Sequence, residues 1–171
     1  MQERTGQYTL KGNPLTLVGP ELKAGDAAPA FSAFIGLGKL FESSELAGKV
    51  RFINVVPSVD TGICDAQTKR FSDEANKING VEWITISCDT PMALGRWCQA
   101  GNITNLRMLS DFRDHDFGLK YGAYVKEVGL LQRSIFIVGK DDKLAYVQRC
   151  PEFAAHPDYD AALEALKSAL A

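Results

Sequence analysis

The stretch FINVVPSVDTGIC, residues 52–64, decides the fold. Its first part, Phe52 to Val56, is an apolar run rich in β-branched residues and predicts a buried strand. A turn-forming segment follows, and beyond it apolar residues recur at helical spacing. The stretch therefore predicts strand, turn and helix, with Cys64 in the first turn of the helix. Because a helix N-terminus carries unpaired N–H groups and positive partial charge, it favours a thiolate over a thiol.

The rest of the chain alternates strands and helices around this unit. Hydrophobic periodicity and turn residues predict strands at 51–56, 81–87, 107–109, 134–138 and 144–147 and helices at 64–78, 90–101, 114–121 and 157–170. Short apolar segments around Gly12-Asn13-Pro14 predict an extra N-terminal β-hairpin at about residues 7–20. We expect the helix at 90–101 to begin after Thr90 as N-cap and to close at Gly101.

This order of elements is α/β and resembles the thioredoxin-like fold, a central mixed sheet flanked by helices. The chain has 171 residues, so we expect a single domain, 1–171, with a sizeable core. In such folds chemistry takes place where the C-terminal end of a strand meets a helix N-terminus. Cys64 occupies that place in the predicted fold.

Composition narrows the possible partners and compartment. The net charge is −2, with acidic and basic residues interspersed, which argues against nucleic acid or an anionic membrane surface as a partner. No apolar run is long enough to span a bilayer. The first residues, Met1 to Gly6, lack the basic start and apolar stretch of a signal peptide. We therefore expect a cytoplasmic protein.

The cysteines are spread along the chain, at Cys64, Cys88, Cys98 and Cys150. They form no Cys-x-x-Cys pair, and the two histidines, His115 and His156, stand far from them in sequence. This spacing argues against a clustered zinc site, so we expect neither a metal nor another cofactor. We expect His115 at the surface near a helix start, and any disulfide to be transient and catalytic. From its neighbours alone, Cys98 fits an ordinary core position.

The segment Pro57-x-x-x-Thr61-x-x-Cys64 matches the active-site motif of peroxiredoxins. Further segments, Thr68-Lys69-Arg70-Phe71, residues 109–114 (LSDFRD) and the KExGLLxR pattern of residues 126–133, resemble those of bacterial thiol peroxidases, the atypical two-cysteine peroxiredoxins. The resemblance covers nearly the whole chain. One position departs from the family pattern: Gly62 stands where many relatives have proline. Glycine has more backbone freedom than proline and loosens the turn that presents Cys64.

The resemblance implies a residue-by-residue assignment of the site. It implies that Cys64 is the peroxidatic cysteine and Cys98 the resolving cysteine, joined in an intramolecular disulfide during turnover. It also implies that Arg133 lies near Cys64 and stabilises the thiolate, that the Thr61 hydroxyl contacts sulfur and peroxide, and that Pro57 shields the pocket. The implied activity is reduction of hydrogen peroxide and organic hydroperoxides for antioxidant defence. The implied reductant is thioredoxin, and the implied assembly a homodimer.

Two other functional classes remain. A thioredoxin-fold sensor or binding module would be oxidised once at Cys64 without turnover. A disulfide oxidoreductase is disfavoured because Cys-x-x-Cys is missing. Peroxide consumption in the presence of thioredoxin, its reductase and NADPH distinguishes the enzyme from the sensor.

Overall fold

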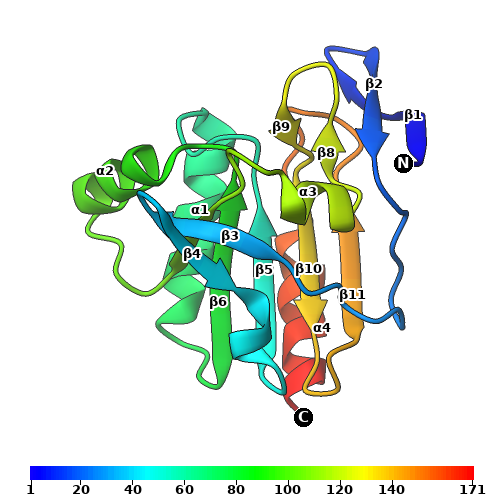
Figure 1. The fold of residues 1–171 in the computed structure, drawn as a ribbon. Coiled ribbons are helices and arrows are strands. Elements are labelled where there is room, and N and C mark those ends of the chain that lie inside the picture. Colours follow the sequence, from blue (N-terminus) through cyan, green and yellow to red (C-terminus); the bar gives the residue numbers. More distant parts are fainter.

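A computed structural model describes the whole chain, residues 1–171, and places a seven-stranded mixed sheet at its centre (Figure 1). Its strands are β3 (Ser32–Gly36), β4 (Lys39–Glu42), β5 (Val50–Val55), β6 (Val81–Ser87), β7 (Arg107–Ser110), β10 (Ser134–Val138) and β11 (Leu144–Arg149). They lie in the order β11-β10-β5-β6-β7-β3-β4. The three central strands β5, β6 and β7 are parallel, while β10 and β3 pair antiparallel to them on either side. The predicted central mixed sheet is confirmed.

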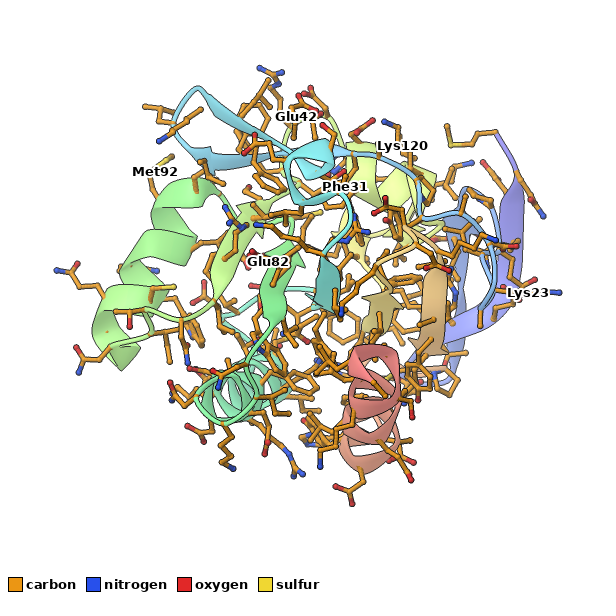
Figure 2. All side chains as sticks on the ribbon, turned by 90° about the horizontal axis from the view of Figure 1, so that it is seen from below. Lys23, Phe31, Glu42, Glu82, Met92 and Lys120 are labelled. Atoms are coloured by element: carbon orange, nitrogen blue, oxygen red, sulfur yellow. The ribbon has the colours of Figure 1, made fainter.

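Helices cover both faces of this sheet. They are α1 (Gly62–Ala75), α2 (Pro91–Gly101), α3 (Asp116–Lys120), α4 (Tyr159–Leu170) and the short 3-10 helix η1 (Ser43–Leu46). Viewed from below, α1 and α4 lie together on one face, while η1 and the loop carrying Phe31 lie on the other (Figure 2). Each face of the sheet has its own hydrophobic core. Successive residues of β5 contribute to the two cores in turn, because Cβ atoms alternate across a strand. Phe52 packs in the α1–α4 layer and Ile53 in the layer of Phe31.

The hairpin predicted at the N-terminus is confirmed, but it begins earlier than expected. β1 (Glu3–Leu10) and β2 (Asn13–Val18) pair with β8 (Tyr124–Val125) and β9 (Leu130–Leu131) in a second sheet of order β1-β2-β8-β9. The turn lies at Lys11-Gly12, with φ of 51° and 80°, rather than at Gly12-Asn13-Pro14. A two-residue turn with both φ values positive matches the twist of paired strands, so Asn13 and Pro14 belong to β2.

The start of α2 follows the sequence signals, and its end does not. The Thr90 side chain accepts a hydrogen bond from the Ala93 N–H at 3.3 Å, and Pro91 is the first helical residue. Gly101 remains helical, and Asn102, with φ of 53°, ends the helix. Asparagine tolerates the left-handed conformation that a helix C-terminus often needs, which displaces the predicted end by one residue.

The sequence predicts no strand or helix for residues 32–46. This segment forms β3, β4 and η1 at the edge of the central sheet. The strands are short and are joined by a tight turn that contains Gly38. Neither strand shows the long alternating pattern by which strands are recognised in a sequence.

No helix of the structure combines the length and the hydropathy that crossing a membrane requires.

Gly122, between α3 and β8, lies against the backbone of the segment that follows β2. Its φ is 61°, and a Cβ atom there would lie 1.9 Å from the Pro20 carbonyl oxygen. The Arg4 guanidinium also donates a hydrogen bond to the Gly122 carbonyl at 2.5 Å. This crowding leaves no room for a side chain on Gly122.

We expect Gly122→Ala to lower the free energy of unfolding by more than about 2 kcal/mol, because a strained backbone costs of order 1–3 kcal/mol before any clash is added. Urea denaturation measures the change. The matched control is Gly95→Ala, on an open face of α2 with nothing within 4 Å of the added Cβ. Alanine is a better helix former than glycine, so this control should be stabilised by roughly 0.5–1 kcal/mol. Equal stabilities of the two variants would contradict the prediction.

Candidate active site

Cys64 lies in the first turn of α1, directly beyond the C-terminal end of β5. Its side chain is fully buried and packs with Val56, Val59 and Leu94. The first N–H groups of α1 have no acceptor within the helix, and the N-cap residue Thr61 makes no side-chain cap bond. The positive end of the helix therefore lies beside the buried sulfur of Cys64. Negative charge on that sulfur is favoured by the helix N-terminus.

Arg133 brings a cation to the same sulfur from the neighbouring strand. It precedes β10, and the pairing of Ser134 with Val55 sets it opposite the end of β5. Its Nη1 lies 3.3 Å from Cys64 Sγ, within hydrogen-bond distance of sulfur. Arg133 is only 1% exposed, so this contact is shielded from water. A guanidinium keeps its charge in such a setting, and hydrogen bonds to an ionised acceptor are the stronger ones.

Further polar groups hold the guanidinium in place. Arg133 Nη1 also donates to Gln67 Oε1 at 2.9 Å, and Nη2 donates to the Phe153 carbonyl at 2.9 Å. Gln67 Nε2 in turn donates to Asn54 Oδ1 at 2.5 Å. The Asn54 amide then bonds the hydroxyl groups of two buried threonines, Thr68 and Thr85. This continuous buried network fixes the arginine against the sulfur.

The sequence reasoning missed Asn54 and Gln67, although signals for both were present. Asn54 is a polar residue in the middle of an otherwise apolar strand, and a buried polar side chain requires a partner. Gln67 lies three residues after Cys64, so the two side chains share a face of α1. Neither signal identifies the arginine as the common partner.

Tyr8 extends the site toward the N-terminal hairpin. Its side chain is fully buried, and its ring packs against Phe153 with centroids 6.3 Å apart. Burial raises the pKa of Tyr8 above its usual range, while the charge of Arg133 opposes that shift. The hydroxyl has no hydrogen-bond partner in the protein, and neither has Arg133 Nε. The neutral phenol therefore adds an unused donor beside the buried arginine.

The loop between β5 and α1 carries Pro57 and Thr61. Pro57 is buried and Thr61 half-buried, and the Thr61 hydroxyl donates to the Ser58 carbonyl at 3.2 Å. Asp89, another residue that the sequence reasoning missed, anchors the loop from the end of β6. It accepts hydrogen bonds from Ser58 Oγ at 2.7 Å and from the Val59 N–H at 2.9 Å. Gly62, by contrast, is exposed, with nothing within 4 Å of an added Cβ.

Cys98 lies on α2, half-buried, and is not bonded to Cys64. The two helices are in contact, since Trp97 Nε1 donates to Asp65 Oδ1 at 2.8 Å and Leu94 packs against Cys64. Burial raises the pKa of the Cys98 thiol. It does the same at Cys150, and at Cys88 the pKa reaches about 12. Those three cysteines are therefore favoured as neutral thiols.

A cysteine at the N-terminus of the helix after a central parallel strand, in contact with a buried arginine, defines a thioredoxin-like thiol redox protein. The sequence profile of the Redoxin family matches residues 23–163, and the chain belongs to that family. The thiol peroxidase of Halalkalibacterium halodurans is 46% identical over 162 residues, 95% of this chain and 98% of that protein. The thiol peroxidase of Bacillus subtilis is 44% identical over 162 residues, 95% of this chain and 97% of that protein.

Solved structures agree with these relatives. The peroxiredoxin-like protein from Aquifex aeolicus superposes with a TM-score of 0.89 at 38% identity, covering 96% of this chain and 98% of that one. The thiol peroxidase from Chromobacterium violaceum superposes with a TM-score of 0.84 at 20% identity, covering 94% and 95%, and shows the shared fold. The resemblance inferred from the motifs is confirmed, and the chain is a peroxidase of the peroxiredoxin type.

Proposed function

We propose that the protein reduces hydrogen peroxide and organic hydroperoxides through a sulfenic acid on Cys64 and an intramolecular Cys64–Cys98 disulfide, with thioredoxin as the reductant. The single observation that carries the proposal is the 3.3 Å contact between Arg133 Nη1 and Cys64 Sγ at the N-terminus of α1. The thiol peroxidase relatives support the same reading.

The first step is attack of the Cys64 thiolate on the terminal peroxide oxygen. The O–O bond breaks, sulfur gains the oxygen as sulfenic acid, and the leaving oxygen departs with a proton as water or an alcohol. The Arg133 guanidinium and the N–H groups of Ile63 and Cys64 stabilise the negative charge that develops on that oxygen. Positioned donors of this kind contribute roughly 3 kcal/mol each in a dry site. The Thr61 hydroxyl contacts the sulfur and the peroxide, and Pro57 shields the thiolate from water.

The second step joins the two helices. The Cys98 sulfur attacks the sulfenic sulfur of Cys64, the S–O bond breaks, and water leaves as the disulfide forms. A disulfide needs Cα atoms within about 7 Å. Cys64 is fully buried and both residues are helical, so we infer that the first turn of α1 and the adjoining part of α2 unwind before the bond forms. A thioredoxin dithiol then reduces the disulfide and restores both thiols.

The test is a peroxidase assay with thioredoxin, its reductase and NADPH, on the wild type and on Cys98→Ser. We expect continuous NADPH oxidation by the wild type. Cys98→Ser should consume one equivalent of peroxide per chain and then recycle poorly, because its sulfenic acid has no partner thiol. Non-reducing mass spectrometry after one equivalent of peroxide should find the Cys64–Cys98 disulfide in the wild type alone. A single turnover by the wild type would support the sensor, and a disulfide to Cys88 or Cys150 would reject Cys98.

We also propose a cytoplasmic homodimer. Exposed apolar side chains support the dimer, since patches of this kind mark interaction surfaces. They are Ile35, Leu37 and Leu40 on the β3–β4 hairpin, of which Leu37 is 82% exposed, and Met92 at the start of α2, which contacts β3. Met92 stands at the outer rim of the molecule in Figure 2.

We expect sedimentation analysis to give a dimer for the wild type and a monomer for Leu37→Glu, because a charge would be buried in the interface. Val128→Glu is the matched control, since Val128 is an exposed apolar residue outside this patch. A wild type that stays monomeric at high concentration, or a Leu37→Glu variant that remains dimeric, would reject the proposed interface.

A further inference from the structure

Three chemically distinct metal-ligating side chains converge beside the C-terminal ends of two neighbouring strands. Cys88 follows β6, Asp111 follows β7, and His115 precedes α3. One ligand atom from each of the three lies within 4.8 Å of the others. Cys88 Sγ is 3.7 Å from His115 Nδ1. None of the three belongs to the network around Cys64 and Arg133.

Packing and hydrogen bonds hold these side chains in position. Asp111 is 2% exposed, and its carboxylate accepts hydrogen bonds from the Phe117 N–H at 3.0 Å and the Gly118 N–H at 2.8 Å. The His115 ring packs on Tyr124 with centroids 4.6 Å apart. These contacts use only part of the lone-pair capacity of the carboxylate.

The donor set identifies the kind of ion. A thiolate and an imidazole together select a borderline transition metal such as zinc, whereas calcium and magnesium take oxygen ligands. Bond lengths of about 2.3 Å to sulfur and about 2.05 Å to nitrogen in a tetrahedral site separate the two ligand atoms by about 3.6 Å. The observed separation of 3.7 Å is close to this value.

We propose that Cys88, Asp111 and His115 form a Zn²⁺ site with three protein ligands and one open position. Cys88 binds as thiolate, releasing its proton to solvent, and His115 binds through Nδ1 with the proton on Nε2. Cys88 and His115 are half-buried, so the ion has a route from solvent. The separation of the cysteines and histidines along the chain argued against a metal site, but the fold brings Cys88 and His115 together. Peroxide reduction at Cys64 needs no metal. Failure of zinc to bind would therefore leave the proposed peroxidase function intact, and loss of that function would leave the zinc site intact.

The test is metal titration of the reduced full-length chain in a Cys64→Ser/Cys98→Ser background, which removes the two cysteines assigned to the peroxidase reaction. We expect one Co²⁺ per chain with a thiolate-to-cobalt charge-transfer band, and displacement of that Co²⁺ by one Zn²⁺. Cys88→Ala should abolish the band. Competition with a chromophoric chelator should show that His115→Ala and Asp111→Asn weaken zinc binding by more than the about 10–100-fold that loss of an outer hydrogen-bond partner costs.

The chain offers matched controls for two of the ligands. Cys150→Ala and His156→Ala remove a cysteine and a histidine outside the cluster, and we expect both to bind zinc as the parent does. A charge-transfer band that survives Cys88→Ala, or zinc binding that is lost equally in Cys150→Ala, would overturn the proposal. So would the absence of any stoichiometric binding by the parent.

A second readout does not depend on the serine background. Zinc should raise the melting temperature of the wild-type chain and of His156→Ala, because a ligand that binds only the folded state stabilises it. It should leave the melting temperature of a folded His115→Ala variant unchanged. An equal zinc-dependent rise in both histidine variants would contradict the site.

Discussion

Replacing Cys64 with serine is expected to abolish peroxide reduction, to the level of the reaction without protein. A serine hydroxyl is not ionised near neutral pH, and its oxygen cannot accept the peroxide oxygen as sulfur does. The helix N-terminus and Arg133 remain in place in this variant, so the loss isolates the contribution of the sulfur. NADPH oxidation coupled through thioredoxin measures turnover, and stopped-flow mixing with peroxide measures the first oxidation alone.

The matched control for Cys64→Ser is Cys150→Ala, which removes another buried and unpaired cysteine. Burial raises the pKa of the Cys150 thiol, so it supplies little thiolate and its loss should leave most of the activity. Retention of full cycling by Cys64→Ser, or an equal loss in the two variants, would reject Cys64 as the reacting cysteine.

Replacing Arg133 with methionine is expected to slow the first oxidation by about 10²–10³-fold, the cost of removing one oriented donor from a site of developing charge. A second effect follows from the loss of the cation. The thiolate is less favoured without it, so the rate should rise at higher pH than in the wild type and reach a lower plateau. A structural role alone would lower stability without moving this pH profile.

Arg133→Lys separates charge from geometry. Lysine keeps a positive charge but lacks the planar fork that reaches Cys64, Gln67 and the Phe153 carbonyl together. Compared with Arg133→Met, we expect Arg133→Lys to restore part of the wild-type pH profile but less of the wild-type plateau rate. Stopped-flow oxidation between acidic and alkaline pH gives both quantities.

Arg149 provides a control arginine outside the site. It is half-buried, donates hydrogen bonds to the backbone carbonyls of Tyr121 and Gly122 and does not contact Cys64. Arg149→Met should lower stability and leave the pH profile of the first oxidation where it is. If Arg133→Met keeps the wild-type profile, the guanidinium does not stabilise the thiolate, and the proposed function loses the observation on which it rests.

The exposed Gly62 is the first residue of α1, next to the loop that carries Pro57 and Thr61. The family resemblance leads us to expect proline after the motif threonine, but this chain has Gly62, where an added Cβ would meet nothing within 4 Å. Greater backbone freedom at this position would ease the unwinding of α1 that we proposed for the Cys64–Cys98 disulfide. The preceding part of the loop is nevertheless anchored, because Asp89 accepts hydrogen bonds from Ser58 and Val59.

Long-range geometry explains which residues sequence reasoning could not place. The buried network depends on Asn54 and Gln67, whose partners come from other elements. Two of the proposed zinc ligands, Cys88 and Asp111, meet because the strands that they follow, β6 and β7, pair in parallel. A turn or a helix cap is decided by neighbouring residues, whereas these clusters are decided by strand pairing.

The amino-acid sequence by itself determined the strand, turn and helix that carry Cys64, because apolar spacing and helix-end chemistry act over a few residues. It also determined the family and the order of the longer strands and helices after residue 50. Only the tertiary structure decided how Arg133, 69 residues away in the chain, meets that sulfur. The physical reason is the antiparallel register of β10 on β5, which pairs Ser134 with Val55 and sets the guanidinium against the first turn of α1.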